Sequence, residues 1–324
     1  MKPLIIILIF FFFNYFITIF INKFKFILFI KMDVSIGVMA YNEERNISYL
    51  LDALLNQKTK KINIEEIIII SSGSIDKTNN LVKNVSKKNK KIKLIIEKER
   101  TGKSHAINLF LKKAKNTVLV LESADTIPNR NTIENLCLPL LNKRIGMIGG
   151  KSIPKNRSYF FKKISEIIWR LHHEIAKQKP KFGEIIAFRN IINNIPQTAV
   201  DEEEIASIIK KKELKLIYEP EAIIYNKGPE TIVDFIRQRR RIFCGHLKLK
   251  KRTGYSASTM NAYSLFKIVV KYLLNNPNKI VWILITFILE QISRLLGLID
   301  FIRKKDYFIW KISKSTKQLS LGDE

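Results

Sequence analysis

Ile67-Ile68-Ile69-Ile70-Ser71-Ser72-Gly73-Ser74 is the stretch of this 324-residue chain that says most about its architecture. Four consecutive β-branched residues are typical of a strand that is buried on both faces, as strands of parallel sheets are. The Ser-Ser-Gly-Ser segment after them is a turn signal, and a predicted helix follows with Asp76 near its start. The stretch therefore predicts one strand, a polar turn and a helix of an α/β protein.

The same alternation of strand and helix extends to both sides of this stretch. Apolar runs and helical spacing predict strands at residues 34–39, 93–96 and 117–121 and helices at 46–56 and 105–113. Alternating strands and helices form βαβ units, so we expect a mostly parallel central sheet with helices on both faces. Because no Pro- or Ser-rich linker interrupts this pattern, we assign residues 32–252 to one domain.

Ligands in such sheets bind at the carboxyl ends of the strands. Three polar groups occupy those positions, at residues 41–43, 71–74 and 123–125. Asp125 is the most informative of these residues, because a carboxylate after a buried strand can hold a divalent cation against a diphosphate. A turn or helix-capping role is the alternative for Asp125.

The charge of the chain is strongly positive, with 57 Lys and Arg, 29 Asp and Glu, and a formal net charge of +28. Such a charge suggests a phosphate-rich partner: nucleic acid, anionic lipid or a nucleotide. Lys is spread over many predicted helices and loops, which favours a general compositional bias, and we expect no nucleic-acid partner. Cys137 and Cys244 form neither a metal-type pair nor a disulfide framework, which fits a reducing compartment.

The amino-terminal region is predicted to be a membrane anchor, residues 1–31. Residues 3–21 are almost wholly apolar, which is about the length that crosses a bilayer as a helix. No small-residue cleavage site follows, so an anchor is favoured over a signal peptide. Lys23, Lys25 and Lys31 lie after the span and Lys2 before it, so the positive-inside rule places the following domain in the cytoplasm, at the cell membrane.

The carboxyl-terminal region, residues 253–324, is predicted to hold amphipathic or membrane helices and a basic tail. Residues 262–274 resemble an interfacial amphipathic helix. Residues 280–302 are apolar but contain Glu290 and Arg294, which are four apart and could pair on one helix face. This second stretch could span the bilayer, dip into it or lie in the interface.

Two charged clusters follow in the second half of the domain. Asp201-Glu202-Glu203-Glu204 suits the first turn of a helix, and one of these acids could also serve as a general base for an acceptor hydroxyl. Arg237-Gln238-Arg239-Arg240-Arg241 lies on a helix predicted to start near Thr231. Arg clusters bind phosphate oxygens, and Gln238 and Arg241 share one helix face.

Six short motifs, in this order, resemble the family 2 glycosyltransferases, which have a GT-A type fold. The match covers roughly residues 34–250. The motifs are Ala40-Tyr41-Asn42-Glu43-Glu44, Ser72-Gly73-Ser74 with Asp76, Gly102-Lys103-Ser104-His105-Ala106-Ile107-Asn108, Ser123-Ala124-Asp125-Thr126, Asp201-Glu202 and Gln238 to Ile242, the last resembling a Gln-x-x-Arg motif.

The resemblance implies an inverting transfer of a sugar from a nucleotide-diphosphate sugar to a hydroxyl acceptor, lipid-linked or otherwise delivered at the membrane. It implies Mg²⁺ or Mn²⁺ at Asp125, a base at Glu202 or Asp201, and a diphosphate clamp made of Gln238 and Arg241. The donor-binding residues it implies lie at the ends of the first four strands and on the arginine helix: Ala40, Tyr41, Glu43, Ser72, Asp76, Lys103, Ser123 and Arg240.

Four positions depart from the family pattern. Ser72 and Ser123 stand where Asp is common, Met39 replaces a Pro, and Ile242 replaces the Trp near the acceptor. The first three departures bear on which nucleotide sugar is the donor. The replacement of Trp by Ile242 bears on whether the protein synthesises a polymer processively. Two other classes of function are therefore retained: an inactive transferase-like membrane protein, and a basic membrane protein that binds anionic lipid or nucleic acid.

Overall fold

The computed structural model describes residues 31–309 and 314–317. The apolar stretch at residues 3–21, and with it the predicted anchor, lies outside the described residues. Within them, the strands form one eight-stranded sheet in the order β3-β2-β1-β4-β7-β6-β8-β5. The strands are β1 (Met32–Ala40), β2 (Ile62–Ser72), β3 (Ile92–Glu97), β4 (Val118–Ser123), β5 (Thr126–Pro128), β6 (Ile145–Pro154), β7 (Ile185–Arg189) and β8 (Lys215–Asn226).

The expected mostly parallel sheet is confirmed. The first four strands pair in parallel, with β1 between β2 and β4 and with β3 outside β2. β6 and β8 form a further parallel pair. β7 runs antiparallel to both β4 and β6, and the short β5 runs antiparallel to β8. The antiparallel β7 therefore joins an amino-terminal parallel half to a carboxyl-terminal half.

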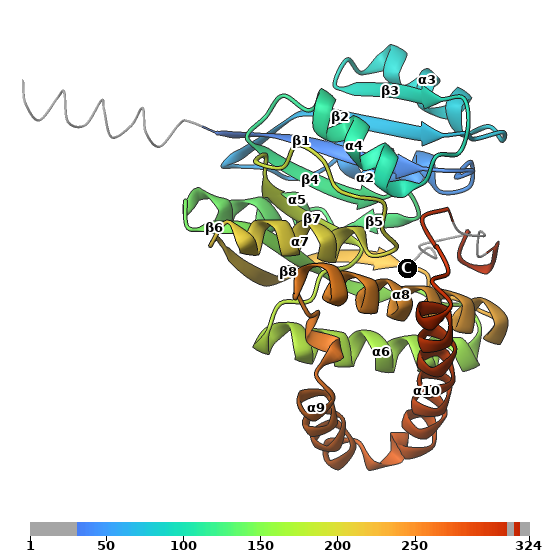
Figure 1. Cartoon of the computed structure of the whole chain (residues 1–324). Helices are drawn as coiled ribbons and strands as arrows, with labels where there is room; N and C mark the ends of the chain where they lie inside the picture. Colours follow the sequence, from blue (N-terminus) through green and yellow to red (C-terminus); the bar gives the residue numbers. More distant parts are fainter. Residues whose placement is uncertain (1–30, 310–313, 318–324) are drawn as a thin grey trace, which may run out of the picture.

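Helices cover both faces of the sheet (Figure 1). The α-helices of the described residues are α2 (Ile47–Leu55), α3 (Thr78–Lys88), α4 (Lys103–Lys113), α5 (Thr132–Cys137), α6 (Tyr159–Gln178), α7 (Asp201–Lys211), α8 (Ile232–Thr253), α9 (Ala262–Asn275) and α10 (Ile280–Ile302). The 3-10 turns are η1 (Leu138–Leu141), η2 (Ser258–Met260), η3 (Pro277–Lys279) and η4 (Lys314–Thr316).

The four isoleucines of β2 show why this strand is buried on both faces. Ile67 and Ile69 enter the hydrophobic core that α2, α3 and α5 cover. Ile68 and Ile70 enter the core on the other face, which α4 and α7 cover. Successive side chains of a strand point to opposite faces, so an uninterrupted apolar run requires a helix layer on each side.

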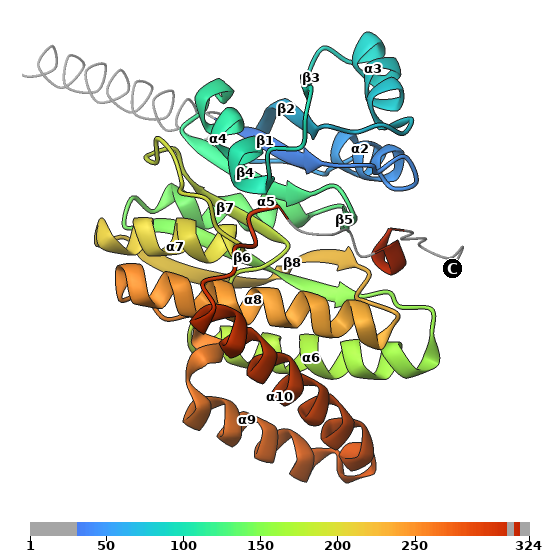
Figure 2. The same ribbon diagram turned by 45° about the vertical axis from the view of Figure 1, so that its right-hand side comes forward.

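α8 and α10 are held together by charged pairs and by close packing. Arg239 donates to both carboxylate oxygens of Glu290, at 2.7 and 2.9 Å, and Arg240 forms an ion pair with Asp300. The pair predicted between Glu290 and Arg294 is present, at 3.0 Å. α10 thus turns its charged residues toward the domain and packs obliquely against α8 (Figure 2).

The opposite faces of α9 and α10 expose large apolar side chains. On α10, Val281, Leu284 and Leu295 are each more than half exposed, as are Tyr263 and Leu274 on α9. Among the described residues, Pro277–Ile302 is the one helical stretch that is long and apolar enough to cross a membrane. Burial of its charged residues against α8 distinguishes this helix from an isolated span.

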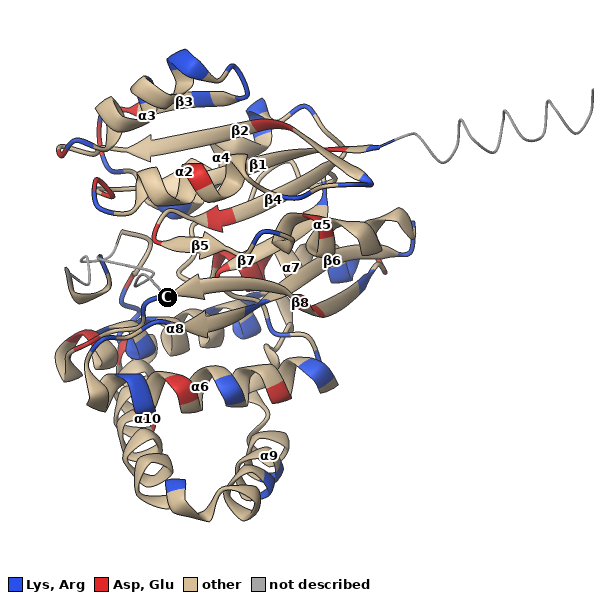
Figure 3. Ribbon diagram, turned by 180° about the vertical axis from the view of Figure 1, so that it is seen from behind, with Lys and Arg blue, Asp and Glu red and all other residues tan. Residues whose placement is uncertain are grey.

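Lys and Arg lie on elements throughout the fold and are not gathered on one element. Figure 3 shows them from α3 at one end of the molecule to α6 and α9 at the other. This distribution agrees with the compositional interpretation of the net charge.

We predict that Gly297→Ala destabilises the protein. A Cβ at this position would lie 2.7 Å from the backbone oxygen of Arg240 and 3.3 Å from Cβ of Phe243. Overpacking of this kind costs about 1–3 kcal/mol, which exceeds the helix-propensity gain of about 1 kcal/mol. The melting temperature should therefore fall. Gly183→Ala is the matched control, since its nearest atoms would be 3.8 Å away; an equal or smaller loss in Gly297→Ala would contradict close packing of α10 on α8.

Candidate active site

One cavity of about 1300 Å³ opens at the carboxyl ends of the parallel strands. Ala40 ends β1, Ser72 ends β2 and Ser123 ends β4, and all three line the cavity. Of the thirteen site residues expected from the sequence, Asp76 alone does not line it. The residues that do are Ala40, Tyr41, Glu43, Ser72, Lys103, Ser123, Asp125, Asp201, Glu202, Gln238, Arg240 and Arg241.

Lys103 and two acids form the centre of the cavity. Lys103 is the first residue of α4, and its Nζ lies 2.6 Å from Oε1 of Glu202 and 4.0 Å from Oδ2 of Asp201. Both acids begin α7, where the helix dipole favours negative charge. Ser104 donates from Oγ to Oδ1 of Asp201 at 2.7 Å. The Asp201 side chain is 3% exposed and that of Glu202 is 20% exposed, so Glu202 is the more accessible carboxylate.

Burial and Lys103 act in opposite directions on the two acids. Burial alone would raise the pKa of Glu202, but the Lys103 ammonium outweighs it and lowers that pKa below its ordinary value. Burial raises the pKa of Asp201 to about 6, with Lys103 opposing the rise. Glu202 is therefore ionised at neutral pH. Asp201 has a pKa of about 6, so its carboxyl group titrates close to neutral pH.

Asp125 and Glu184 form a second acidic pair in the cavity. Burial raises the pKa of Asp125. Burial also raises the pKa of Glu184, to about 7, and the charge of Asp125 adds to the rise. Two partly buried carboxylates whose charges repel each other are an arrangement that a bound cation would stabilise.

These residues fit a divalent cation held in part by a nucleotide. No cluster of three or more His, Cys, Asp and Glu side chains suited to a metal ion occurs within residues 31–309 and 314–317. Mg²⁺ at phosphate sites is commonly bound through one or two carboxylates, with phosphate oxygens and water completing its shell. Asp125 together with Glu184 supplies such a partial set of oxygen ligands.

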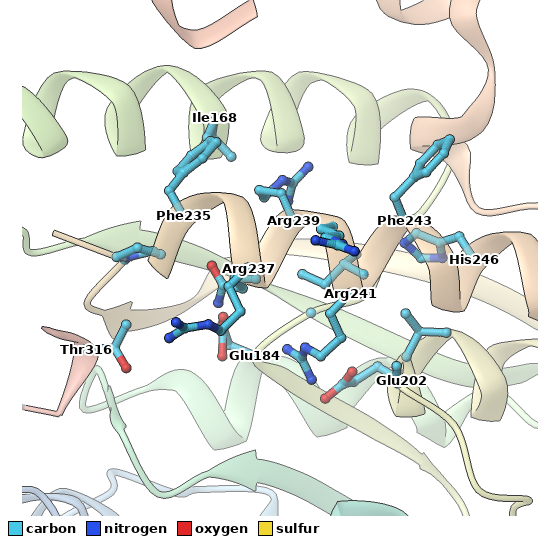
Figure 4. A pocket seen from close by; sticks show the side chains of 18 of the residues that line it. Ile168, Glu184, Glu202, Phe235, Arg237, Arg239, Arg241, Phe243, His246 and Thr316 are labelled. Carbon is cyan, nitrogen blue, oxygen red and sulfur yellow. The ribbon is translucent and has the colours of Figure 1, made fainter. Parts of the chain in front are cut away.

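The arginine run of α8 divides between two faces of the helix. Figure 4 shows Arg241 on the side of Glu184 and Glu202, whereas Arg239 points toward α6. Arg239 and Arg240 are paired with the carboxylates of α10, and Arg237 pairs with Asp234 at 2.9 Å. Arg241 is thus the guanidinium of the run that is directed at the acidic centre. The ion pair with Asp300 occupies the guanidinium of Arg240, and the predicted donor-binding role of Arg240 stays a prediction.

An aromatic and cationic surface lies in another corner of the cavity, where β1 and β2 end. The guanidinium carbon of Arg100 lies 4.1 Å from the centroid of the Tyr41 ring. The amide of Thr101 donates to Oγ of Ser72 at 3.4 Å, so this hydroxyl lies in the same corner. A planar base could contact Tyr41 or Arg100 here, and Ser72 offers a neutral hydroxyl where a carboxylate is common in the family.

Asp76 joins two loops beside the cavity. Its Oδ1 accepts from the amide of Thr78 at 2.9 Å, and its Oδ2 accepts from the amide of Glu44 at 3.0 Å. These bonds connect the loop after β1 to the loop after β2. The Asp76 carboxylate therefore positions these two loops. The predicted contact between Asp76 and the nucleotide-sugar donor stays a prediction.

The described segment near the carboxyl end reaches the same corner. Lys317 forms an ion pair with Glu43 and donates from Nζ to the carbonyl oxygen of Tyr41 at 3.0 Å. Burial lowers the pKa of Lys317 to about 8. Ser315 donates to Oδ2 of Asp234 at 2.6 Å, which holds the segment against the start of α8.

Arg100, Glu184 and Lys317 are charged cavity residues among those to which the sequence assigns no role. Glu184 directly precedes β7, so its position after an apparent loop could have suggested a site residue. Lys317 is 274 positions from Glu43, and no local pattern links the two.

The chain belongs to glycosyl transferase family 2, whose family model matches residues 35–201. Poly-beta-1,6-N-acetyl-D-glucosamine synthase of Staphylococcus aureus is 25% identical over 265 residues, covering 76% of this chain and 62% of that protein. The chain thus spans less than two thirds of this curated relative. A probable glycosyltransferase of Bacillus subtilis, YdaM, is 33% identical over 122 residues, covering 36% of this chain and 29% of that protein.

Solved structures confirm the GT-A type fold. The mannosyltransferase PcManGT from Pyrobaculum calidifontis, in complex with GDP-Man and Mn²⁺, has a TM-score of 0.64 at 19% identity, covering 86% of this chain and 89% of that chain. Glucosyl-3-phosphoglycerate synthase from Mycobacterium tuberculosis, in complex with Mg²⁺ and UDP, has a TM-score of 0.50 at 17% identity, covering 70% of this chain and 81% of that chain.

We predict that Lys103→Met destabilises the fold, and more so as the pH rises. Without the ammonium, burial raises the pKa of both Asp201 and Glu202, so their ionisation opposes folding above their unfolded pKa values. Breaking a buried pair by removing one partner costs about 3 kcal/mol.

Thermal unfolding of the variant and the wild type at about pH 5 and about pH 8 tests this prediction. The difference in melting temperature should be larger at the higher pH. Lys98→Met, at an exposed position of the preceding loop, is the matched control. A difference that is independent of pH would show that Lys103 does not set the ionisation of these acids.

Proposed function

We propose that the protein is an inverting glycosyltransferase that moves a sugar from a nucleotide-diphosphate sugar to an acceptor hydroxyl delivered at the membrane. The observation that carries this proposal is the convergence of Asp125, Glu202 and Arg241 in one cavity at the carboxyl ends of parallel strands. Membership of glycosyl transferase family 2 supports the reaction class. The arrangement of acids and cations supports the roles that follow.

Nucleotide-sugar binding is assigned to the strand ends. Tyr41 and Arg100 supply a surface for the base, and Ser72 supplies a neutral hydrogen-bonding group beside it. Structural neighbours that were solved with GDP-Man or UDP support a nucleoside diphosphate in this place. Asp125, with Glu184 nearby, would hold Mg²⁺ or Mn²⁺, which when bound neutralises charge on the diphosphate.

Proton removal is assigned to Glu202. Its lowered pKa keeps it ionised, and its partly exposed side chain can reach an acceptor in the cavity. Glu202 takes the proton of the acceptor hydroxyl as that oxygen bonds to the anomeric carbon from the face opposite the diphosphate. Asp201, which accepts from Ser104 and lies beside Lys103, positions the ammonium.

Departure of the diphosphate is assisted by α8. The bond between the anomeric carbon and the diphosphate oxygen breaks, and its electron pair stays on the nucleoside diphosphate. Arg241, which is half-buried and directed at the acidic centre, offsets the negative charge that develops on the diphosphate. Gln238 lies one turn earlier on the cavity-lining part of α8 and is assigned to the same leaving group.

Membrane delivery of the acceptor is supported by two features. The apolar stretch at residues 3–21 suits an anchor, with the domain on the cytoplasmic side. The exposed apolar faces of α9 and α10 suit contact with a lipid surface, while the charged face of α10 is bound to α8. This placement supports a lipid-linked acceptor.

We predict that Asp125→Asn abolishes metal-dependent nucleotide binding. In the wild type, Mn²⁺ with UDP or GDP should raise the melting temperature by about 3 °C or more at saturating ligand. The variant should show no such rise. Asp52→Asn, an exposed change on α2, should behave as the wild type. A full metal-dependent rise in Asp125→Asn would refute the metal assignment.

We predict that Glu202→Gln lowers kcat by about 10²–10⁴-fold, the usual contribution of a general base. Asp201→Asn should lower kcat by less, because its role is to position Lys103. The assay is transfer from UDP- and GDP-sugars to a membrane lipid extract, with the wild type as reference. If Asp201→Asn is the more severe change, Asp201 is the base. If the wild type neither transfers nor hydrolyses any of these donors, the proposed function is wrong.

A further inference from the structure

The cavity extends past the residues that the proposed reaction uses. Its extension is lined mainly by apolar side chains of three helices, and we name it the apolar arm. Its lining residues include Ile168 and Trp169 of α6, Leu265 and Val269 of α9, and Ile283 and Phe287 of α10. Figure 1 shows these three helices framing a triangle on the side of the domain away from β3. Figure 4 shows Phe235 of α8 facing Ile168 of α6 at the same level.

The volume of the cavity supports a second ligand. Sites for single small molecules have volumes of about 300–1000 Å³. The cavity has about 1300 Å³ and continues from the acidic centre into the apolar arm. A nucleotide sugar at the strand ends would leave the apolar arm unfilled, because the diphosphate and the sugar need the polar residues around Arg241.

A buried polar atom on α8 lacks a partner beside the apolar arm. His246 is 4% exposed, lines the cavity, and its Nδ1 has no hydrogen-bond partner among the described residues. Burial lowers the pKa of His246 far below its ordinary value, with the charges of Lys181 and Arg239 adding to the effect. The imidazole is therefore neutral, so His246 adds no positive charge to the lining of the cavity.

The surface around the apolar arm is suited to lipid. Tyr263, Phe266 and Leu274 of α9 and Leu284 of α10 are each more than half exposed. Exposed apolar patches of this kind mark sites of contact with membranes or proteins. Because these residues share helices with the lining of the apolar arm, a molecule in a lipid layer would already lie beside it.

We propose that the apolar arm binds the hydrocarbon chain of a lipid acceptor, whose headgroup presents its hydroxyl to Glu202. A hydrocarbon chain needs no hydrogen-bond partners, whereas a polysaccharide in this apolar lining would leave hydroxyls unpaired at a cost. The reacting step rests on the proposed function. The binding of the hydrocarbon chain does not rest on it, and this binding can be measured without turnover.

Photolabelling of the full chain tests the proposal directly. The protein is placed in phosphatidylcholine nanodiscs with a single-chain alkyl phosphate that carries a diazirine at the chain end, and the labelled residues are located by mass spectrometry. Label should appear on α6, α9 and α10 residues that line the apolar arm, and excess unlabelled alkyl phosphate should remove it. Label confined to surface residues such as Leu274 and Val281, or to the segment at residues 3–21, would overturn the proposal.

Two neighbouring valines of α9 give a matched pair of variants. Val269 lines the apolar arm, whereas Val270 is 36% exposed and does not line it. Val269→Trp should lower labelling in the apolar arm by about tenfold because it overfills the site, and Val270→Trp should leave labelling unchanged. Equal labelling in both variants would overturn the proposal. The labelling sites in the wild type decide the matter even if Val269→Trp does not fold.

Hydrolysis of nucleotide-sugar donors by the wild type is measured separately. Label in the apolar arm without transfer from, or hydrolysis of, any donor supports the lipid site and contradicts the proposed function. Donor hydrolysis without label in the apolar arm supports a transferase and contradicts this site. The two proposals therefore fail by different observations.

Discussion

The ion pair between Lys103 and Glu202, at 2.6 Å, is the interaction on which the rest of the site depends. Lys103 begins α4, in the parallel half of the sheet, and Glu202 begins α7, which packs on the other half. Four carboxylates converge in the cavity between these halves: Asp125, Glu184, Asp201 and Glu202. Uncompensated burial of such charges is costly, so the cations of Lys103 and Arg241 make the convergence possible.

The parallel half of the domain could be predicted from the sequence because its strands are buried on both faces. Ile67 to Ile70 needs apolar cover on each side, and this requirement shows directly as an uninterrupted run. The polar residues that follow such runs, among them Ser72 and Asp125, end parallel strands and therefore meet at one edge. Local pattern and three-dimensional position coincide in this half, so the sequence can predict which of its residues line the cavity.

The remaining part of the site depends on contacts between distant segments, which carry no local signal. The family resemblance implies a donor-binding role for Arg240, yet Arg240 pairs with Asp300 on α10. Asp76 follows a strand end, but its carboxylate is used by the amides of Thr78 and Glu44. Lys317 reaches Glu43 across most of the chain length. In each case the packing of distant segments determines which group the side chain contacts. Neither the periodicity of the sequence nor the spacing of its motifs describes that packing.

α8 links two environments through one uninterrupted helix. Arg239 and Arg240 bind the carboxylates of α10, whose outer face is apolar, and Arg241 is the next residue and faces the acidic centre. A rigid helix transmits a displacement along its length, whereas a flexible loop would absorb it. A displacement of α10 against the domain would therefore shift the guanidinium of Arg241 relative to Glu184 and Glu202, so the outer face of α10 is mechanically coupled to the charges of the acidic centre.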